Sequence, residues 1–203
     1  MTMNPKRQYF HDLAPQWDSF PTVPDAPAKI RRYLERSARP GARQILDVGC
    51  GTGILLPYLL EMYPQTACLV EFDFAEGMLV ENARKFADDR VLRVCADVQN
   101  LPFVGPSFDL VLCFSVLPHF SDAVSAVERL YRALRPQGVL TVGHMSASKE
   151  LNEFHSSLDA PVRHDRLPPA GELGVILRRL GATVVRLEEE TDWYFVRAEK
   201  GSA

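Results

Sequence analysis

A chain of 203 residues, with a net charge of −3 and 46% hydrophobic residues, has the composition of one ordinary globular domain. This composition excludes collagen, coiled coils and disordered chains, and the acidic balance disfavours nucleic acid as a partner, because such binders neutralise phosphates. The apolar runs are about ten residues long, half of what a membrane-spanning helix needs, so no membrane span is expected.

The N-terminus and the cysteines both indicate the cytoplasm. The opening 20 residues lack the apolar core of a signal peptide. The cysteines show no CxxC spacing, and three of them lie in apolar runs, so we expect free thiols in a reducing compartment. They are Cys50, Cys68, Cys95 and Cys113. No metal-ligand spacing is present either, and we expect no metal site.

Apolar runs and helical patterns alternate along the chain after an expected leading helix at Ala26–Ser37. The expected strands are Gln44–Val48, Ala67–Phe72, Val91–Cys95, Phe108–Phe114, Val139–His144, Thr183–Glu188 and Trp193–Ala198. The expected helices between them are Gly53–Met62, Glu76–Ala87, Asp122–Leu134 and Gly171–Leu180. The helical period turns Ile54 of the first helix and Ala83 of the second inward.

This alternation predicts an α/β fold in one domain, with a mostly parallel seven-stranded sheet and helices on both faces. The last strand is expected to be antiparallel, because only a short turn joins the final pair. A cofactor-binding core would span 44–145, and a final helix and hairpin 170–203. Residues 1–24 and 146–169 do not fit the repeat, and we expect both to form lids over the site.

The strongest motif is the glycine cluster LDVGCGTG at Leu46–Gly53, where the first strand ends and a helix begins. Glycines there allow a tight turn and let a ligand approach backbone N–H groups. In open α/β sheets, ligands bind at this carboxyl edge. The third glycine, Gly53, precedes Ile54, so the loop differs from the GxGxxG dinucleotide pattern. A turn that binds no ligand is the alternative interpretation.

Acidic residues follow the next two strands. Asp73 ends the second strand, where a carboxylate can accept hydrogen bonds from both hydroxyls of a ribose. Glu71 lies on the same side of that strand, so periodicity does not separate the two. Asp97 ends the third strand, where it could bind an exocyclic amine such as that of adenine. A helix or turn cap is the alternative role for Asp97.

The ordered motifs resemble the class I S-adenosylmethionine-dependent methyltransferases. They read LDVGCGTG, FDFAEGML, ADVQNLPF, SFDLVLCFSVLPHF and LYRALRPQGVL, and they cover roughly residues 44–145. The opening Tyr9–Asp18 is similar to the lead-in of the ubiquinone- and menaquinone-type enzymes. The resemblance implies one Rossmann-like domain over 1–203. It also implies methyl transfer from S-adenosylmethionine to a small-molecule acceptor, with S-adenosylhomocysteine as product.

The resemblance also implies roles for individual residues. Asp73, rather than Glu71, would bind the ribose, Phe74 would pack on adenine, and Asp97 would bind the adenine amino group. The full implied cofactor site is Trp17, Asp47, Gly49, Cys50, Gly51, Gly53, Asp73, Phe74, Asp97, Val98, Phe114 and Ser115. Within it, Asp47 would orient the loop and Trp17 would lie over the cofactor.

The sequence departs from the family pattern at three positions. Glu71 stands where a small residue is usual, Ala75 where a capping serine is frequent, and Gln137 at the first glycine of a PGG turn. None of these changes removes an implied cofactor contact, so they bear only on the assignment of the chain to a particular subfamily.

The acceptor side offers histidines rather than a known catalytic motif. The chain lacks the (D/N)PP(Y/F) motif of amino-directed nucleic-acid methyltransferases. His119, His144 and His155 are the candidate catalytic residues, because they follow strands or lie in the second lid segment. His155 is preferred over His164, because Phe154 could anchor it in an apolar wall. Surface decoration is the alternative for the segment that holds His155, His164 and Asp165.

Two other functions remain to be separated from this one by experiment. A non-catalytic S-adenosylmethionine-binding module would keep the glycine loop and Asp73. A nicotinamide oxidoreductase is disfavoured by Ile54 and Asp97. The sequence is compatible with a homo-oligomer and does not identify the acceptor.

Overall fold

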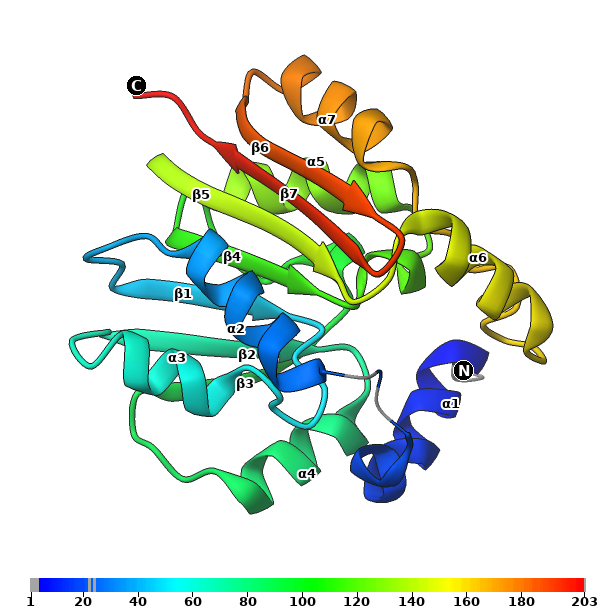
Figure 1. Ribbon diagram of the computed structural model, residues 1–203. Coiled ribbons are helices and arrows are strands. Elements are labelled where there is room, and N and C mark those ends of the chain that lie inside the picture. Colours follow the sequence, from blue (N-terminus) through cyan, green and yellow to red (C-terminus); the bar gives the residue numbers. More distant parts are fainter. Residues whose placement is uncertain (1–3, 22, 24, 203) are drawn as a thin grey trace.

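The computed structural model describes residues 4–21, 23 and 25–202 (Figure 1). The expected lid segment 1–24 therefore lies partly outside the described residues. None of the helices in the described part of the chain combines the length and the apolarity that a bilayer crossing requires.

One seven-stranded sheet organises the molecule, in the order β3-β2-β1-β4-β5-β7-β6. The strands are β1 (Gln44–Val48), β2 (Cys68–Asp73), β3 (Val91–Cys95), β4 (Phe108–Phe114), β5 (Leu134–His144), β6 (Thr183–Glu190) and β7 (Trp193–Glu199). β7 runs antiparallel to both of its neighbours, while the pairs from β3 through β5 are parallel. The predicted α/β fold with an antiparallel last strand is confirmed.

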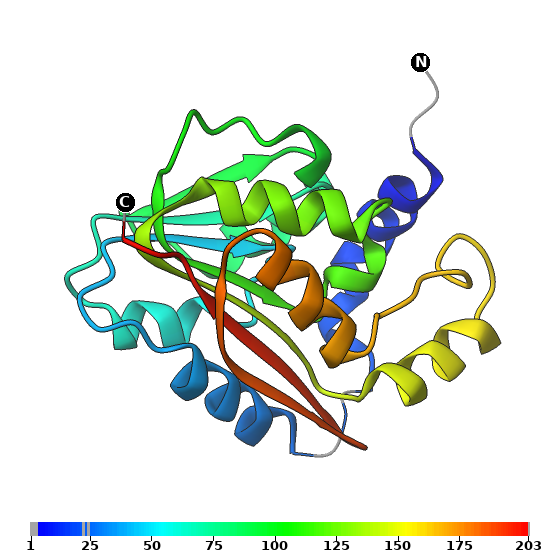
Figure 2. The same ribbon diagram turned by 90° about the horizontal axis from the view of Figure 1, so that it is seen from above.

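Helices cover both faces of this sheet (Figure 2). The α-helices in the described part of the chain are α1 (Pro5–Leu13), α2 (Ala26–Ser37), α3 (Leu56–Met62), α4 (Glu76–Lys85), α5 (Ala123–Ala133), α6 (Ser148–Ser157) and α7 (Ala170–Arg179). α2 and α3 pack on one face through a cluster that includes Tyr33 and Leu59. α5 and α7 pack on the other through Leu130 and Leu177. Because both faces are covered, the central strands are almost wholly apolar.

Two predicted helix faces were wrong. α3 begins at Leu56 instead of Gly53, because the glycine loop continues as a turn, and Ile54 is exposed. In α4, Ala83 is exposed, and Asn82 faces the sheet instead. The polar Asn82 is buried there because its amide donates a hydrogen bond to the carboxylate of Glu71. The amphipathic pattern alone cannot reveal such a polar partner.

The two segments that did not fit the repeat are largely helical. The first holds α1 and a short 3₁₀ helix, η1 (Ala14–Ser19), and the second holds α6. The side chain of Asn4 accepts hydrogen bonds from the backbone of Lys6 and Arg7, which caps the start of α1. In both views, α1 and α6 lie at the end of the sheet toward which the arrows of β1 and β4 point (Figures 1 and 2).

The sheet order places a topological switch point at this edge. β1 lies between β2 and β4, so the chain leaves β1 to one side and later returns on the other. At such a switch point, the loops after the two central strands diverge and leave room for a ligand. The glycine loop follows β1, and a second 3₁₀ turn, η3 (Leu117–His119), follows β4.

Candidate functional site

The three glycines of the loop after β1 serve different purposes. All three have a positive φ, +66° at Gly49, +55° at Gly51 and +92° at Gly53, which other residues adopt only with strain. A Cβ atom on Gly49 would lie 2.1 Å from Val116, and one on Gly53 would lie 2.8 Å from Asn82. A Cβ on Gly51 would meet only the indole nitrogen of Trp17, at 4.0 Å. Gly51 is therefore the position whose open face can receive a ligand.

The N-terminal segment covers this open face. Trp17, on η1, is partly exposed and lies over the loop, with Phe10 and Phe20 against its ring. Thr52 donates its hydroxyl hydrogen to Asp18 at 2.6 Å, and Lys85 forms an ion pair with the same carboxylate. The predicted position of Trp17 over the site is thus compatible with the structure.

α1 also caps the helix that follows β2. The backbone N–H of Gly77 donates to Nδ1 of His11 at 3.0 Å. A Cβ on Gly77 would lie 2.6 Å from the carbonyl oxygen of His11, so only glycine permits this close approach. The imidazole satisfies one of the free N–H groups at the start of α4. This contact explains how the helix tolerates Ala75 where the family often has a capping serine.

Asp73 lies at the end of β2 and supports the glycine loop. Its carboxylate accepts hydrogen bonds from the backbone N–H of Gly51 at 3.0 Å and of Ala75 at 2.8 Å. The side chain is buried, and burial raises its pKa to about 6, against the opposing effect of the backbone hydrogen bonds. Each carboxylate oxygen keeps a further lone pair, so the hydroxyls of a ribose could still bind there.

Glu71, the competitor of Asp73, has a structural partner. It is fully buried, and its carboxylate accepts a hydrogen bond from Asn82 at 2.6 Å. Asn82 in turn accepts from Nε of Arg93 at 2.7 Å. Burial raises the pKa of Glu71 to about 7, and the hydrogen bond from Asn82 opposes this rise. The network engages Oε2 of Glu71 and leaves Oε1 without a partner, whereas Asp73 bonds directly to the loop through Gly51, which favours Asp73 for contact with a ligand.

Four buried side-chain polar atoms have no hydrogen-bond partner among the described residues. They are Oδ2 of Asp47 on β1, Oε1 of Glu71 on β2, Oγ of Ser115 directly after β4, and the hydroxyl of Tyr194 on β7. Burial, with Glu71 and Asp73 nearby, raises the pKa of Asp47 well above its ordinary value. Ser115 has a φ of +56°, a conformation that costs energy outside glycine. Unpartnered polar atoms at a switch point fit a polar ligand. Among the described residues, no hydrogen bond joins the side chain of Asp47 to the glycine loop, so its role in orienting the loop stays a prediction.

The remaining predicted cofactor residues are also at this edge. Asp97 is exposed and accepts a hydrogen bond from the backbone of Gln99 at 2.9 Å, so it does cap a turn, η2 (Val98–Asn100). Val98 and Phe114 have buried side chains, which leaves only their backbone for a ligand. The ring of Phe74 lies against that of Phe10, with the two ring centroids 5.9 Å apart.

Cys50 is buried within the glycine loop. Burial and the nearby carboxylates raise the pKa of its thiol well above the ordinary value. A protonated thiol is a poor nucleophile, so Cys50 would contact a ligand only through its backbone and through side-chain packing.

Two of the three candidate histidines, His119 and His155, contact each other, and the third, His144, lies close enough for their charges to affect it. Nδ1 of His119 lies 2.6 Å from the carboxylate of Asp165, and its ring centroid lies 5.3 Å from that of His155. Nδ1 of His155 lies 3.2 Å from the backbone carbonyl oxygen of Asp165. Burial lowers the pKa of His155, and it lowers that of His144 to about 3, with help from the other two imidazoles. His144 and His155 are therefore neutral near pH 7.

Sequence reasoning missed Lys6, which belongs to this cluster. Lys6 pairs with the carboxylate of Asp165 and also donates to the carbonyl oxygen of His119 at 3.2 Å. Asp165 is buried, so the surface interpretation of this residue and of His155 was wrong, whereas His164 is exposed. The expected wall at Phe154 was also wrong, because this side chain is 57% exposed. No sequence signal links Lys6 to a residue 159 positions away.

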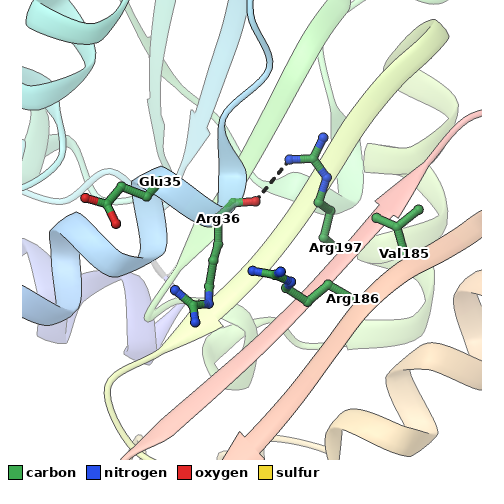
Figure 3. A pocket seen from close by; sticks show the side chains of 5 residues that line it. All are labelled: Glu35, Arg36, Val185, Arg186 and Arg197. Carbon is green, nitrogen blue, oxygen red and sulfur yellow. Dashed lines mark hydrogen bonds between the residues drawn. The ribbon is translucent and has the colours of Figure 1, made fainter.

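A separate hollow lies on the outer face between α2 and the strands β6 and β7 (Figure 3). Its volume is about 330 Å³, and it is lined by Glu35, Arg36, Val185, Arg186 and Arg197. Its arginines are already paired with carboxylates, Arg36 with Glu188 at 2.9 Å and Arg197 with Glu199 at 3.0 Å. The hollow is distinct from the switch point. Across residues 4–21, 23 and 25–202, no cluster of acidic, histidine and cysteine side chains is arranged to hold a metal ion.

The comparisons with known proteins agree with this geometry. The family model described as "Methyltransferase domain" matches residues 46–142. The malonyl-[acyl-carrier protein] O-methyltransferase of Acetivibrio thermocellus is 33% identical over 63% of this chain and 45% of its own length. The demethylmenaquinone methyltransferase of Thermus thermophilus is 35% identical over 66% of this chain and 62% of its own.

A solved structure from Thermotoga maritima shares the fold. It is described as an S-adenosylmethionine-dependent methyltransferase, possible histamine N-methyltransferase. The alignment has a TM-score of 0.73 at 19% identity and covers 95% of this chain and 99% of the other. At this identity the likeness shows the fold alone. The chain spans about half the length of several curated relatives that it matches.

Proposed function

We propose that this chain, whose residues 46–142 match the family model described as "Methyltransferase domain", transfers a methyl group from S-adenosylmethionine to a small-molecule acceptor. When bound, S-adenosylmethionine supplies a methyl carbon that its sulfonium already makes electrophilic. The protein must therefore mainly align the acceptor with that carbon, and positioning alone can lower such a barrier by roughly 7–11 kcal/mol.

The open face of Gly51 is the observation that carries the proposal. It lies beneath Trp17, and its backbone N–H is held by Asp73, so bare backbone and a buried carboxylate stand side by side. In this arrangement Asp73 would accept the ribose hydroxyls, and the loop would receive the methionine part. The unpartnered oxygens of Asp47 and Ser115 lie at the ends of the adjacent strands and suit the polar groups of the same ligand.

The other predicted contacts complete this proposed cofactor site. Phe74 would pack on adenine, while Asp97 would accept from its amino group and still cap η2. The backbone of Phe114 and Ser115 would face the methionine amine. α1, η1 and the segment 146–169 would close the acceptor side, where the histidine cluster lies.

Several broader expectations belong to the same proposal. A reducing, cytoplasmic location is supported by the four cysteines, which are all free thiols. A small acceptor, rather than nucleic acid, is supported by the acidic net charge of −3. The ubiquinone- and menaquinone-type likeness is supported by the Thermus thermophilus relative.

Calorimetry tests the cofactor half of the proposal directly. S-adenosylmethionine, S-adenosylhomocysteine and NAD are titrated separately into the protein. We expect saturable binding of the first two and none of NAD. Binding of NAD alone would contradict the proposal. Transfer of a labelled methyl group to a panel of small acceptors then distinguishes an enzyme from a non-catalytic binding module, which would bind the cofactor without turnover.

A further inference from the structure

His119 is held in a defined orientation at the acceptor edge of the sheet. Its Nδ1 lies 2.6 Å from a carboxylate oxygen of Asp165, whose side chain is buried. Lys6 of α1 binds that same carboxylate and the carbonyl oxygen of His119. Burial tends to raise the pKa of Asp165, but the hydrogen bonds from His119 and Lys6 lower it overall, so Asp165 is ionised near pH 7. Three segments distant in sequence thus fix one imidazole.

The second nitrogen of this imidazole remains available. No hydrogen bond joins Nε2 of His119 to any residue in the described part of the chain, and the side chain is 18% exposed. When Nδ1 carries the proton and donates it to Asp165, the lone pair of Nε2 points away from the carboxylate. A histidine oriented in this way can accept a proton and share the resulting positive charge with its carboxylate.

The neighbouring histidines are less suited to this task. His155 is buried, and its Nδ1 contacts a neutral carbonyl oxygen rather than a carboxylate. His144 accepts a hydrogen bond from the backbone of Ser146 at 3.3 Å. Burial and the other imidazoles lower the pKa of both, so neither readily becomes charged. The remaining charged groups here are Lys6, Asp165 and Arg166, of which Lys6 and Asp165 are paired with each other.

The surroundings of His119 also indicate the shape of its partner. The ring of Phe10 packs against its imidazole with centroids 5.0 Å apart, and Phe10 also contacts Trp17 and Phe74. Phe10, Trp17 and Phe74 therefore form one aromatic cluster that extends from the loop to the imidazole. Such a lining favours an apolar, planar molecule that carries one polar group.

We propose that His119 is the proton acceptor for a hydroxyl group on a planar, apolar acceptor, and that Asp165 and Lys6 are its positioning residues. This inference rests on the proposed methyl transfer. The hydroxyl oxygen forms its new bond to the methyl carbon while the carbon–sulfur bond breaks and leaves its electron pair on sulfur. The hydroxyl proton moves to Nε2 of His119, and the imidazolium, balanced by Asp165, then releases it to water.

The chromogenic phenol 4-nitrophenol tests the proposal without knowledge of the natural acceptor. It is titrated into protein saturated with S-adenosylhomocysteine, and the absorbance of its phenolate is followed. We expect the bound phenol to ionise more readily than the free phenol, and His119→Gln to weaken its binding at least tenfold. His164→Gln, at an exposed histidine next to Asp165 in the sequence, is the control and should bind as the wild type does.

A spectroscopic readout separates positioning from mere structure. Nitrogen-15 NMR of the histidine side chains should show the Nδ1–H tautomer for His119, and Asp165→Asn should shift it toward Nε2–H. Two controls establish that both variants are folded. Each should unfold cooperatively on heating, and each should bind S-adenosylhomocysteine with an affinity within twofold of wild type. If His119→Gln does not fold, two other measurements test the proposal. They are the tautomer of His119 in Asp165→Asn and the ionisation of 4-nitrophenol bound to the wild-type protein.

The possible failures are distinguishable. A wild-type protein that does not bind S-adenosylhomocysteine contradicts the proposed function itself. A protein that binds it but shows no affinity for 4-nitrophenol, or binds the phenol equally well without His119, overturns the role of His119 alone. An unchanged tautomer in Asp165→Asn overturns the positioning role of Asp165.

Discussion

The hydroxyl of Thr52 donates a hydrogen bond to Asp18 at 2.6 Å and so ties the glycine loop to a residue 34 positions earlier. Lys85 of α4 binds the same carboxylate and the carbonyl oxygen of Thr52. The segment that carries Trp17 is therefore attached both to the glycine loop, which would bind the cofactor, and to α4. A change at the loop can be transmitted to this cover through a single carboxylate.

Loss of this attachment should loosen the N-terminal segment. In Asp18→Ala, we expect amide exchange over 5–19 to accelerate several-fold, because a partly exposed charged hydrogen bond contributes about 1 kcal/mol. Hydrogen–deuterium exchange measures the effect. Asp12→Ala removes an exposed carboxylate that bonds only within α1, to Gln8, and is the matched control. Equal exchange in the two variants would show that Asp18 does not hold the segment.

The two lid segments should respond together to the cofactor product. Lys6 of α1 and Asp165 form an ion pair between them, so closing one should order the other. We expect S-adenosylhomocysteine to slow amide exchange in the described parts of 4–21 and in 146–169. The hairpin of β6 and β7 serves as an internal reference. No change in either segment at saturating ligand would rule out lid behaviour.

Asp73→Asn should weaken cofactor binding at least tenfold. The variant keeps the size of the side chain but replaces one acceptor oxygen with a donor, and charged hydrogen bonds contribute roughly 1.5–3 kcal/mol each. Calorimetry with S-adenosylhomocysteine measures the loss. Asp89→Asn, at an exposed position in the turn before β3, is the control and should retain wild-type affinity. Full affinity in Asp73→Asn would refute the ribose assignment.

A comparison of Gly51→Ala with Gly41→Ala distinguishes the effect of backbone strain from the loss of space for a ligand. Gly51 and Gly41 both have a positive φ, +55° and +77°, and neither has a close neighbour where a Cβ would lie. Each alanine variant should therefore lose about 1 kcal/mol of stability through strain. Only Gly51→Ala should weaken S-adenosylhomocysteine binding, because Gly41 lies before β1. Denaturant unfolding and calorimetry measure the two effects, and equal affinities would show that the loop is only a turn.

Glu71 should make the free energy of unfolding fall as the pH rises. Its pKa is raised from an ordinary value near 4.5 to about 7, so the native state keeps a proton that the unfolded chain releases in this window. The resulting loss of stability is about 3 kcal/mol at most by pH 8. Below pH 4.5 both states are protonated and the effect disappears.

Glu71→Gln should remove this dependence, since an amide can still accept from Asn82 but does not titrate. Urea unfolding of both proteins from pH 5 to pH 8 provides the measurement. The difference between them cancels the contributions of groups that do not interact with Glu71, such as His144. A difference that stays constant over this range would contradict the assignment of the raised pKa to Glu71.

The sequence by itself determined the sheet and the ligand-binding edge. The bounds of β1 and β4 follow from runs of apolar residues, because strands covered on both faces have little freedom in composition. The glycine loop and Asp73 were recognisable for a similar reason, since a tight turn at the end of a buried strand restricts which residues can stand there. These are local constraints, and a local pattern records them.

Only the tertiary structure decided what lies over that edge. The contact of Lys6 with Asp165 and the bond from Thr52 to Asp18 join side chains that no periodicity relates. The burial of Asn82 instead of Ala83 likewise depends on Glu71 of a neighbouring strand. A buried polar group is stable only when a partner from elsewhere in the fold reaches it, and that partner is specified by three-dimensional proximity rather than by sequence spacing.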